Sequence, residues 1–344
     1  MDYFEKRNQQ NVLKIRKLQM ELPDLCREFF LGISNITSTL TRLNYAYDLR
    51  IFFDYLSRYE IRRDVLEISL DDLKYVTATQ LECFLDYLNF YEYKGKTYKN
   101  DAHGKARKLS TVKTLFRYFY AKDKLPENVA SKISMPKMHE KPILRLENDE
   151  VEEVLDFVAD GAMPSKKQQQ FHNLTGIRDT AILTLFLGTG IRISELVGLD
   201  INDLDFKNNS FTVTRKGGAR VILYFPEEVA NTLSAYIAVR NDNEVVKEDE
   251  KALFLSLQNK RISVRAVENL VNKYCRLISP LKKITPHKLR STYGTNLYRA
   301  TKDIYVVAEV LGHKDVNTTK KHYAATSDDI RKEAAEKIKL HQNQ

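Results

Sequence analysis

Residues 188–196 read GTGIRISEL and follow a largely apolar run, AILTLFL, at residues 181–187. The apolar run is typical of a buried helix, and the two glycines, Gly188 and Gly190, predict where it ends. A second helix is then predicted to begin at Arg192, with Glu195 three residues later on the same face. An arginine at a helix start is most often an ordinary surface residue, so this segment gains meaning from the stretches that follow it.

Three further stretches combine basic side chains, imidazoles and one phenolic hydroxyl group. The runs SFTVT (210–214) and RVILYF (220–225) are rich in β-branched and aromatic residues and predict a β-hairpin. In PHKLR (286–290) the histidine and the arginine are three residues apart, on one helical face. The side chains concerned are Lys216 at the hairpin tip, His287 with Arg290, and His313 with Tyr323 ten residues further on.

The side-chain types in this set suit phosphodiester chemistry. Two guanidinium groups can hold the non-bridging oxygens of one phosphate through charge-assisted hydrogen bonds, and such fixed donors stabilise a pentacoordinate transition state. A tyrosine hydroxyl can form a covalent phosphoester. An imidazole can accept a proton near neutral pH, and a lysine can protonate a departing alkoxide. Because no carboxylate cluster accompanies the histidines, we expect neither a metal site nor a cofactor.

Most of the remaining chain has the period of amphipathic helices, with apolar residues at i, i+3 and i+4 spacing. The segments concerned are residues 1–31, 38–58, 78–92 and 110–121. The period fails at residues 131–147, where two prolines predict a linker between domains. A second helical domain is expected from residue 148, with a polar surface loop at residues 161–175 and a short third strand at residues 252–255.

Length and composition are those of an ordinary globular protein with about two domains. The chain has 344 residues, of which 43% are hydrophobic and 29% charged. It holds no apolar run near the roughly 20 residues that cross a bilayer, and its polar N-terminus does not suit a secretory signal. The three cysteines lie far apart, which predicts neither disulfides nor a thiolate zinc site. A cytoplasmic protein with no membrane partner is expected.

The positive charge of the chain is concentrated in one segment. Residues 94–142 contain 13 Lys or Arg and 4 Asp or Glu, a balance of +9 that equals the net charge of the whole chain. A cluster of this kind is typical of proteins that bind nucleic acid, although a solvated surface would have the same composition.

Taken together, these residues resemble the signature of the tyrosine recombinases of the integrase family: an arginine after a helix-ending G-x-G, a hairpin lysine, H-x-x-R, L-G-H and a downstream tyrosine. The resemblance extends to the N-terminal half. TRLNYAYDL (41–49) is similar to the core-binding helix of the family, Ser110–Tyr120 to its second DNA-contacting helix, and Pro136-Lys137 to its linker. Within the family the likeness is to the Xer type, and most to the single-recombinase XerS group.

The chain departs from the family pattern at three places, one of which is His322, an unusual residue directly before the tyrosine. Most members have His-Thr directly after H-x-L-R, whereas this chain has Ser291-Thr292. Residues 1–31 have no counterpart in shorter members, and they could contact DNA, contact a neighbouring subunit or simply pack as a helix.

The resemblance implies a mainly α fold with a small antiparallel β-hairpin or sheet in the C-terminal domain. It implies a two-domain DNA clamp, formed by a SAM-like helical core-binding domain and a tyrosine-recombinase catalytic domain. The expected boundaries are residues 1–135 for the core-binding domain with its N-terminal extension helix, 136–147 for the linker, 148–325 for the catalytic domain and 326–344 for a tail helix exchanged between subunits.

The resemblance also implies the reaction. Tyr323 is expected to attack the scissile phosphate and form a 3′-phosphotyrosyl intermediate, with no metal and no ATP. Each other residue has an implied role: phosphate binding for Arg192, Arg290 and His313, general acid for Lys216, proton acceptance for His287 and orientation of Arg192 for Glu195. The residues expected to contact DNA are Thr41, Arg42, Tyr45, Lys105, Arg107, Lys108, Lys113 and Arg117.

The implied partners are double-stranded DNA with a specific two-half-site target and other copies of the chain. Four copies would form a homotetramer on synapsed DNA through their C-terminal tails and exchange strands through a Holliday junction. A DNA translocase or accessory protein could assist. The role expected is Xer-like chromosome dimer resolution. Three alternatives stay open: an integrase or excisionase of a mobile element, a type IB topoisomerase-like nicking-closing enzyme, and a DNA-binding regulator without catalysis.

Overall fold

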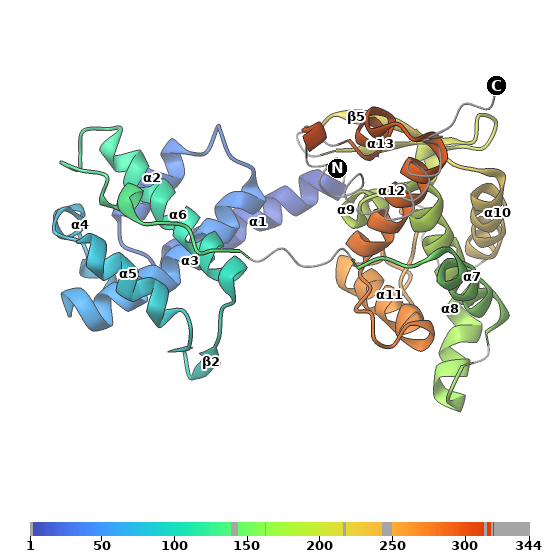
Figure 1. Cartoon of the computed structure of the whole chain (residues 1–344), viewed down its shortest axis with the longest axis horizontal. Coiled ribbons are helices and arrows are strands. Elements are labelled where there is room, and N and C mark those ends of the chain that lie inside the picture. Colours follow the sequence, from blue (N-terminus) through green and yellow to red (C-terminus); the bar gives the residue numbers. More distant parts are fainter. Residues whose placement is uncertain are drawn as a thin grey trace, which may run out of the picture. The chain divides into compact units, whose positions relative to one another are not determined.

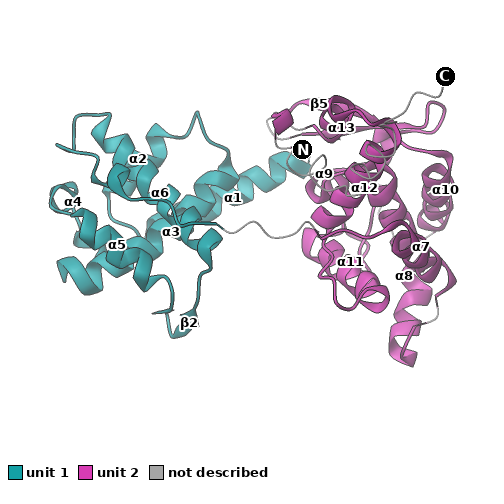
Figure 2. Ribbon diagram, in the orientation of Figure 1, with its two compact units in different colours: residues 1–140 teal, residues 141–344 magenta. Residues whose placement is uncertain are grey.

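The chain divides into two compact units, Met1–Glu140 and Lys141–Gln344 (Figure 2). In this computed structural model the described residues are 3–138, 144–161, 163–215, 218–242, 250–312, 315–317 and 319. Both units are mainly helical, and each has a small antiparallel sheet, as the sequence predicts for the second unit. Among the described helices, none is both long enough and apolar enough to cross a membrane.

The first unit consists of helices and one two-stranded hairpin (Figure 1). Its elements are α1 (Tyr3–Gln19), α2 (Leu25–Gly32), α3 (Thr39–Tyr55), the π-helical η1 (Leu56–Ile61), η2 (Val65–Glu67), α4 (Leu70–Lys74), α5 (Ala78–Tyr87), β1 (Tyr91–Tyr93), β2 (Lys96–Tyr98), α6 (Ala102–Tyr120) and η3 (Val129–Lys132). Side-chain caps set the starts of α3 and α6. The Ser38 hydroxyl accepts from the Thr41 N–H at α3, and the Asp101 carboxylate accepts from the Gly104 N–H at α6.

Aromatic side chains from three helices form the core of the first unit. Phe52 of α3 lies edge-on to Phe84 of α5 and to Phe116 of α6, with ring centroids 5.2 and 6.4 Å apart. All three side chains are fully buried. The Thr39 hydroxyl donates to Asn8 and accepts from Asn11, which fastens α1 to the start of α3.

In place of the single helix predicted at residues 1–31, the described residues form two, α1 and α2, because Pro23 cannot donate to the helical hydrogen-bond ladder. The second of these, α2, lies close against α6. A Cβ atom on Gly32 would lie 2.3 Å from a ring carbon and from the hydroxyl oxygen of Tyr118, so any side chain here would force the tyrosine to shift. The Tyr118 hydroxyl donates to the Glu28 carbonyl, and its ring meets Phe29 edge-on at 5.5 Å.

The second unit is built around one long helix (Figure 1). Its elements are α7 (Asn148–Asp160), α8 (Lys166–Thr189), α9 (Ile193–Gly198), η4 (Ile201–Asp203), β3 (Leu204–Asp205), β4 (Ser210–Thr214), β5 (Arg220–Tyr224), α10 (Glu227–Asn241), α11 (Val264–Ile278), α12 (Pro286–Thr301) and α13 (Ile304–Leu311). Helices α7, α10 and α12 pack against α8. The strands form an antiparallel sheet in the order β3-β4-β5, with Phe211 opposite Leu223.

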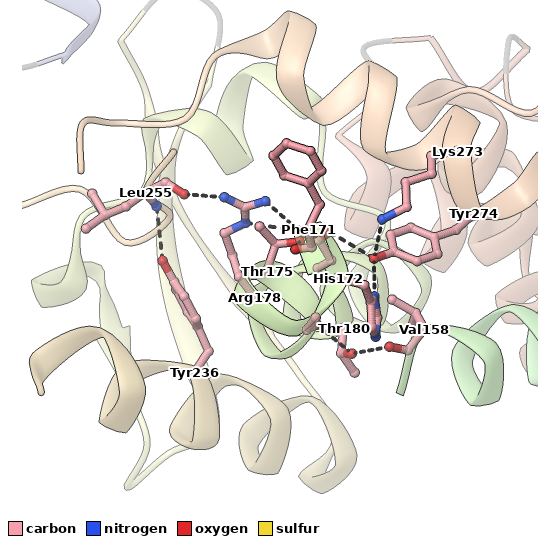
Figure 3. A network of polar contacts seen from close by, with 12 residues as sticks. Val158, Phe171, His172, Thr175, Arg178, Thr180, Tyr236, Leu255, Lys273 and Tyr274 are labelled. Atoms are coloured by element: carbon pink, nitrogen blue, oxygen red, sulfur yellow. Dashed lines mark hydrogen bonds and ion pairs between the residues drawn. The ribbon is translucent and has the colours of Figure 1, made fainter. Parts of the chain in front are cut away.

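Two local predictions for the second unit are wrong. The predicted loop at residues 161–175 is mostly the first half of α8, which begins after the capping side chain of Ser165. Its inward face is polar and bonded within the protein, since the His172 ring contacts the Tyr274 hydroxyl (Figure 3). Residues 252–255 make only isolated bridges, at Ala252 and Leu255, and the third strand of the sheet is β3.

Two helix boundaries in the first unit also differ from the predicted ones. Helix α6 begins at Ala102 rather than Ser110, because Asp101 provides the cap. Helix α5 ends at Tyr87, and the hairpin of β1 and β2 follows where the helical period was expected to continue to residue 92.

Candidate active site

The end of α8 delivers Arg192 to the site. Gly190 ends the helix with a φ of +62°, a left-handed conformation that favours glycine. A Cβ atom there would lie 2.4 Å from the Tyr293 ring, so the position has no room for a side chain. Arg192 follows as the N-cap residue of α9, as the sequence predicts.

Glu195 and two main-chain carbonyls hold the Arg192 guanidinium. Its Nη1 donates to Glu195 Oε1 at 2.8 Å, and the Arg192 N–H donates to the other carboxylate oxygen at 3.0 Å. Its Nη2 donates to the carbonyl oxygens of Leu311 and Gly312, at 3.0 and 2.9 Å. The Glu195 side chain is 3% exposed and that of Arg192 is 34% exposed, so the carboxylate is covered while the arginine reaches the surface.

Arg290 of α12 is buried and donates hydrogen bonds to carbonyls at the ends of α8 and α13. Its Nη1 donates to the Gly190 carbonyl at 2.5 Å, and its Nη2 donates to the Leu311 carbonyl. The residue is 4% exposed. Arg192 and Arg290, which are 98 positions apart in the sequence, therefore share the Leu311 carbonyl as an acceptor.

A third arginine, which the sequence did not single out, reaches the same helix end. Arg215 follows β4, and its Nη2 donates to the Val310 carbonyl at 3.0 Å. Burial lowers the pKa of Arg215, and the nearby charge of Arg192 lowers it further, while Glu195 opposes both effects. The sequence signal was present in the pair Arg215-Lys216, but an arginine beside a turn usually belongs to the surface.

The end of α13 is therefore the centre of a cationic site. The last carbonyls of a helix carry partial negative charge, which makes a helix C-terminus a favourable place for cations. Three guanidinium groups use those carbonyls, and none of these acceptors carries a full charge. The arrangement holds the three arginines in place around one helix end, and Arg192 pairs with Glu195 as well.

His287 lies one turn before Arg290 on α12, and its side chain is exposed. Pro286 occupies the first position of the helix. Ser291, which stands where most family members have histidine, donates through its hydroxyl to the His287 carbonyl at 3.1 Å. The buried Thr292 hydroxyl accepts from the Leu146 N–H at 3.0 Å and joins the start of the second unit to α12.

The structure thus brings Arg192, Arg290 and Glu195 together, with His287 a turn away. Three of the predicted catalytic residues, Lys216, His313 and Tyr323, lie outside the described residues, as does the predicted tail at 326–344. Within the described ranges, no group of three or more His, Cys, Asp or Glu side chains could hold a metal ion.

The predicted DNA-contacting residues of α3 lie in its first two turns. Thr41 takes part in the helix cap through its N–H and its hydroxyl group. Tyr45 packs against the core, with its ring 6.4 Å from that of Phe29. Arg42 is half-buried, and its Nε has no hydrogen-bond partner in the described part of the chain.

The predicted DNA-contacting residues of α6 differ in exposure. Arg107 and Arg117 are exposed and Lys105 is half-exposed. Lys108 is buried and donates to Asn100 at 2.8 Å, whereas Lys113 donates to the Ile133 carbonyl at 2.5 Å. The ammonium groups of these last two lysines thus already bond within the protein.

Asp48 of α3 connects these two helices, a role the sequence did not assign to it. Its buried Oδ2 accepts from Arg107 Nη1 at 2.5 Å and from the Thr111 hydroxyl at 3.0 Å. Burial raises the pKa of Asp48, and the charges of Arg107 and Lys108 oppose the rise. The aspartate occupies the eighth position of TRLNYAYDL, so the motif itself marked it.

Comparison with known proteins places this architecture in one family. Residues 145–329, more than half of the chain, match the phage integrase family. Tyrosine recombinase XerC of Caldanaerobacter subterraneus subsp. tengcongensis is 33% identical over 334 residues, which cover 94% of this chain and 89% of that protein. Tyrosine recombinase XerS of Streptococcus thermophilus (strain ATCC BAA-491 / LMD-9) is 29% identical over 336 residues, which cover 89% of this chain and 93% of the relative.

A solved structure has the same fold. The XerH site-specific recombinase, crystallised with a palindromic difH substrate as a post-cleavage complex, matches with a TM-score of 0.69 and 19% identity. The match covers 96% of this chain and 89% of that one.

The chain has two helical units, and in the second unit arginines from α9 and α12 bond to the end of α13. Together with the matches above, this makes it a DNA-cutting and DNA-rejoining enzyme of the tyrosine recombinase class. The chain belongs to the phage integrase family. Within this family its relatives include both XerC and XerS recombinases.

Proposed function

We propose that this chain is a site-specific recombinase that resolves chromosome dimers in the manner of the Xer proteins. Its relatives over nearly the whole length are named XerC and XerS. The observation that carries the proposal is the convergence of Arg192 and Arg290 on the Leu311 carbonyl, with Glu195 fixing the first of them. Two pre-placed guanidiniums at one point suit a single phosphate.

In the proposed reaction the Tyr323 hydroxyl attacks the scissile phosphorus, and the bond from phosphorus to the 5′-oxygen breaks. Arg192, Arg290 and His313 hold the phosphate oxygens. Lys216 gives a proton to the leaving 5′-oxygen, and His287 takes or shares the proton of the tyrosine. Because the phosphotyrosyl bond replaces a phosphodiester bond, a 5′-hydroxyl from a partner duplex reverses the step without ATP or metal.

Glu195 is proposed to orient Arg192 rather than to touch DNA. Its carboxylate is buried, and its two oxygens bond the N–H and the guanidinium of the same residue. Three of the five N–H hydrogens of the Arg192 guanidinium point at Glu195, Leu311 and Gly312. This leaves the group fixed in direction, which is what a phosphate-binding donor requires.

The assembly is proposed from the family resemblance. Residues 1–135 would bind one half-site and residues 148–325 would cut it, with the two joined through residues 136–147 and closed around double-stranded DNA. Four copies would join two duplexes through the tail at 326–344, in the cytoplasm with the chromosome, with or without an accessory protein or translocase. The exposed Arg107 and Arg117 support a salt-dependent DNA contact on α6.

The decisive experiment is covalent capture of DNA. The chain is incubated with a duplex nicked next to the cut site, so that the released fragment diffuses away and the phosphotyrosyl adduct accumulates on a denaturing gel. The wild type should form the adduct. Tyr323→Phe should form none while binding DNA almost as well, because only the nucleophilic oxygen is missing. An adduct formed by Tyr323→Phe would show that another residue attacks.

The biological role needs a separate measurement. Covalent complexes formed on genomic DNA of the source organism are mapped by sequencing the trapped ends. A single site near the replication terminus is expected for chromosome dimer resolution. Sites at the ends of a mobile element would instead identify an integrase, and relaxation of supercoils by a monomer would identify a topoisomerase-like enzyme.

A further inference from the structure

Arg215 joins two segments that carry different proposed catalytic residues. Its backbone closes the hairpin, since the Arg215 N–H donates to Ala219 at 2.8 Å and its carbonyl accepts from Gly218 at 3.0 Å. Its side chain extends to the other segment and donates to the Val310 carbonyl at the end of α13. Lys216 is the next residue after Arg215, and His313 lies three residues after Val310.

The guanidinium of Arg215 also fills the space beside Gly312. This glycine has a φ of +61° and ends α13. A Cβ atom on it would lie 2.0 Å from Nη1 of Arg215, so the guanidinium lies directly against the glycine backbone. The Gly312 carbonyl accepts from Arg192. Gly312 therefore bonds to Arg192 from the start of α9 and lies against Arg215 from the hairpin.

The helix end and the charge of Glu195 stabilise the Arg215 cation, but only against part of the cost of its burial. In the described part of the chain, the buried Nε of Arg215 has no hydrogen-bond partner and its guanidinium forms no ion pair. A partly buried cation whose bonded partner is a carbonyl oxygen keeps much of its desolvation cost. Leucine or methionine would pack against Gly312 without that cost.

We propose that Arg215 is a positioning residue for the strand-cleavage reaction. By tying the hairpin to the end of α13, it sets Lys216 relative to the phosphate that Arg192 and Arg290 hold. The inference rests on the proposed function. Loss of Arg215 should then impair protonation of the leaving 5′-oxygen and leave the attack of the Tyr323 oxygen on phosphorus largely intact.

The test compares two leaving groups. One substrate has the ordinary 5′-oxygen at the scissile phosphate, and the other has a bridging 5′-sulfur, which leaves as a thiolate and needs no proton. Arg215→Ala should cleave the oxygen substrate about 100-fold more slowly than wild type, the lower range for loss of a general acid. On the sulfur substrate its rate should return to within about tenfold of wild type. Lys216→Ala should give the same pattern.

Two further variants serve as matched controls. Arg220→Ala removes another hairpin arginine, which is exposed and pairs with Asp203, and should cleave both substrates at the wild-type rate. Arg215→Met keeps the length and apolar contact of the side chain without the charge. It should reproduce the Arg215→Ala pattern, and it replaces that variant if the alanine protein does not fold.

The proposal is overturned if the sulfur substrate is slowed as much as the oxygen substrate, because Arg215 would then act on folding or on phosphate binding. It is also overturned if both substrates are cleaved at the wild-type rate. Failure of the proposed function looks different, since the wild type itself would then form no Tyr323 adduct with either substrate.

Discussion

Two polar clusters of the second unit compensate their arginine charges in different ways. In the first, Arg178 donates from Nε and Nη2 to Asp179 Oδ1 at 3.0 and 2.7 Å, so that opposite full charges are in contact. In the second, at the end of α13, Arg192, Arg215 and Arg290 donate to main-chain carbonyls. Arg192 also forms an ion pair with Glu195.

The first cluster holds helices together. Around Asp179 the Tyr274 hydroxyl donates to the carboxylate at 3.0 Å and receives bonds from Lys273 and His172, each at 2.9 Å (Figure 3). These residues lie on α8 and α11, and Arg178 continues the network to the Leu255 carbonyl. The two clusters thus differ in purpose: the ion pair of Arg178 with Asp179 stabilises the fold, whereas carbonyls at the end of α13 fix the direction of arginines that converge on one point.

The largest expected effect comes from breaking the matched cluster. Asp179→Asn leaves Arg178 without its carboxylate in a covered site, and the free energy of unfolding should fall by about 3 to 5 kcal/mol. Urea unfolding followed by circular dichroism measures this change. Glu195→Gln also replaces a carboxylate with an amide, on α9 beside the end of α13. It should slow cleavage, and its free energy of unfolding should fall by less than that of Asp179→Asn. Equal losses of stability in the two variants would contradict the comparison.

The second effect is catalytic. Arg192→Lys keeps the charge but cannot span Glu195 and the carbonyls of Leu311 and Gly312, so the cleavage rate should fall about 10²- to 10³-fold. The rate is measured with the nicked substrate at saturating protein. Arg178→Lys is the matched control, and it should lower the unfolding midpoint while the folded protein cleaves at the wild-type rate. A slow Arg178→Lys protein would show that the two clusters are coupled.

The smallest effect is a pH dependence of stability from His172. Burial lowers the pKa of His172, and the charge of Lys273 lowers it further, while Asp179 opposes the shift; Tyr274 also faces the ring. Below about pH 6.5 the unfolded chain therefore binds a proton that the folded chain does not, and stability falls as the pH falls, by at most about 1.4 kcal/mol per pH unit. His172→Gln should remove this slope between pH 7 and pH 5, and an unchanged slope would mean that folding does not shift the pKa of His172.

The sequence predicts the parts of the fold that have a regular apolar period or a strong turn signal. The hairpin of β4 and β5 and the break between α8 and α9 are both present, because Gly190 and the β-branched runs act locally. The first half of α8 was missed for a physical reason. His172, Thr175 and Asp179 face inward but bond to one another or to Tyr274, so buried positions look like solvent-exposed ones in the sequence.

The candidate site was predicted mainly by its resemblance to a family, since spacing alone does not show that residues 98 positions apart share one carbonyl. Arg215 shows the limit of that approach. It lies beside a signature lysine, but only the position of Val310 and Gly312 in space reveals what its side chain contacts. Asp48 was missed similarly, because its partner Arg107 lies 59 positions away.

The contact of Gly32 with Tyr118 has a consequence for the history of the family. A glycine at one position permits the aromatic ring at the other, 86 positions away, so the two should change together among homologues. A relative with a side chain at position 32 should carry a smaller residue at position 118. A relative that lacks α2 altogether has lost the constraint, and its residue at position 118 should drift toward the polar types expected of an exposed helix face.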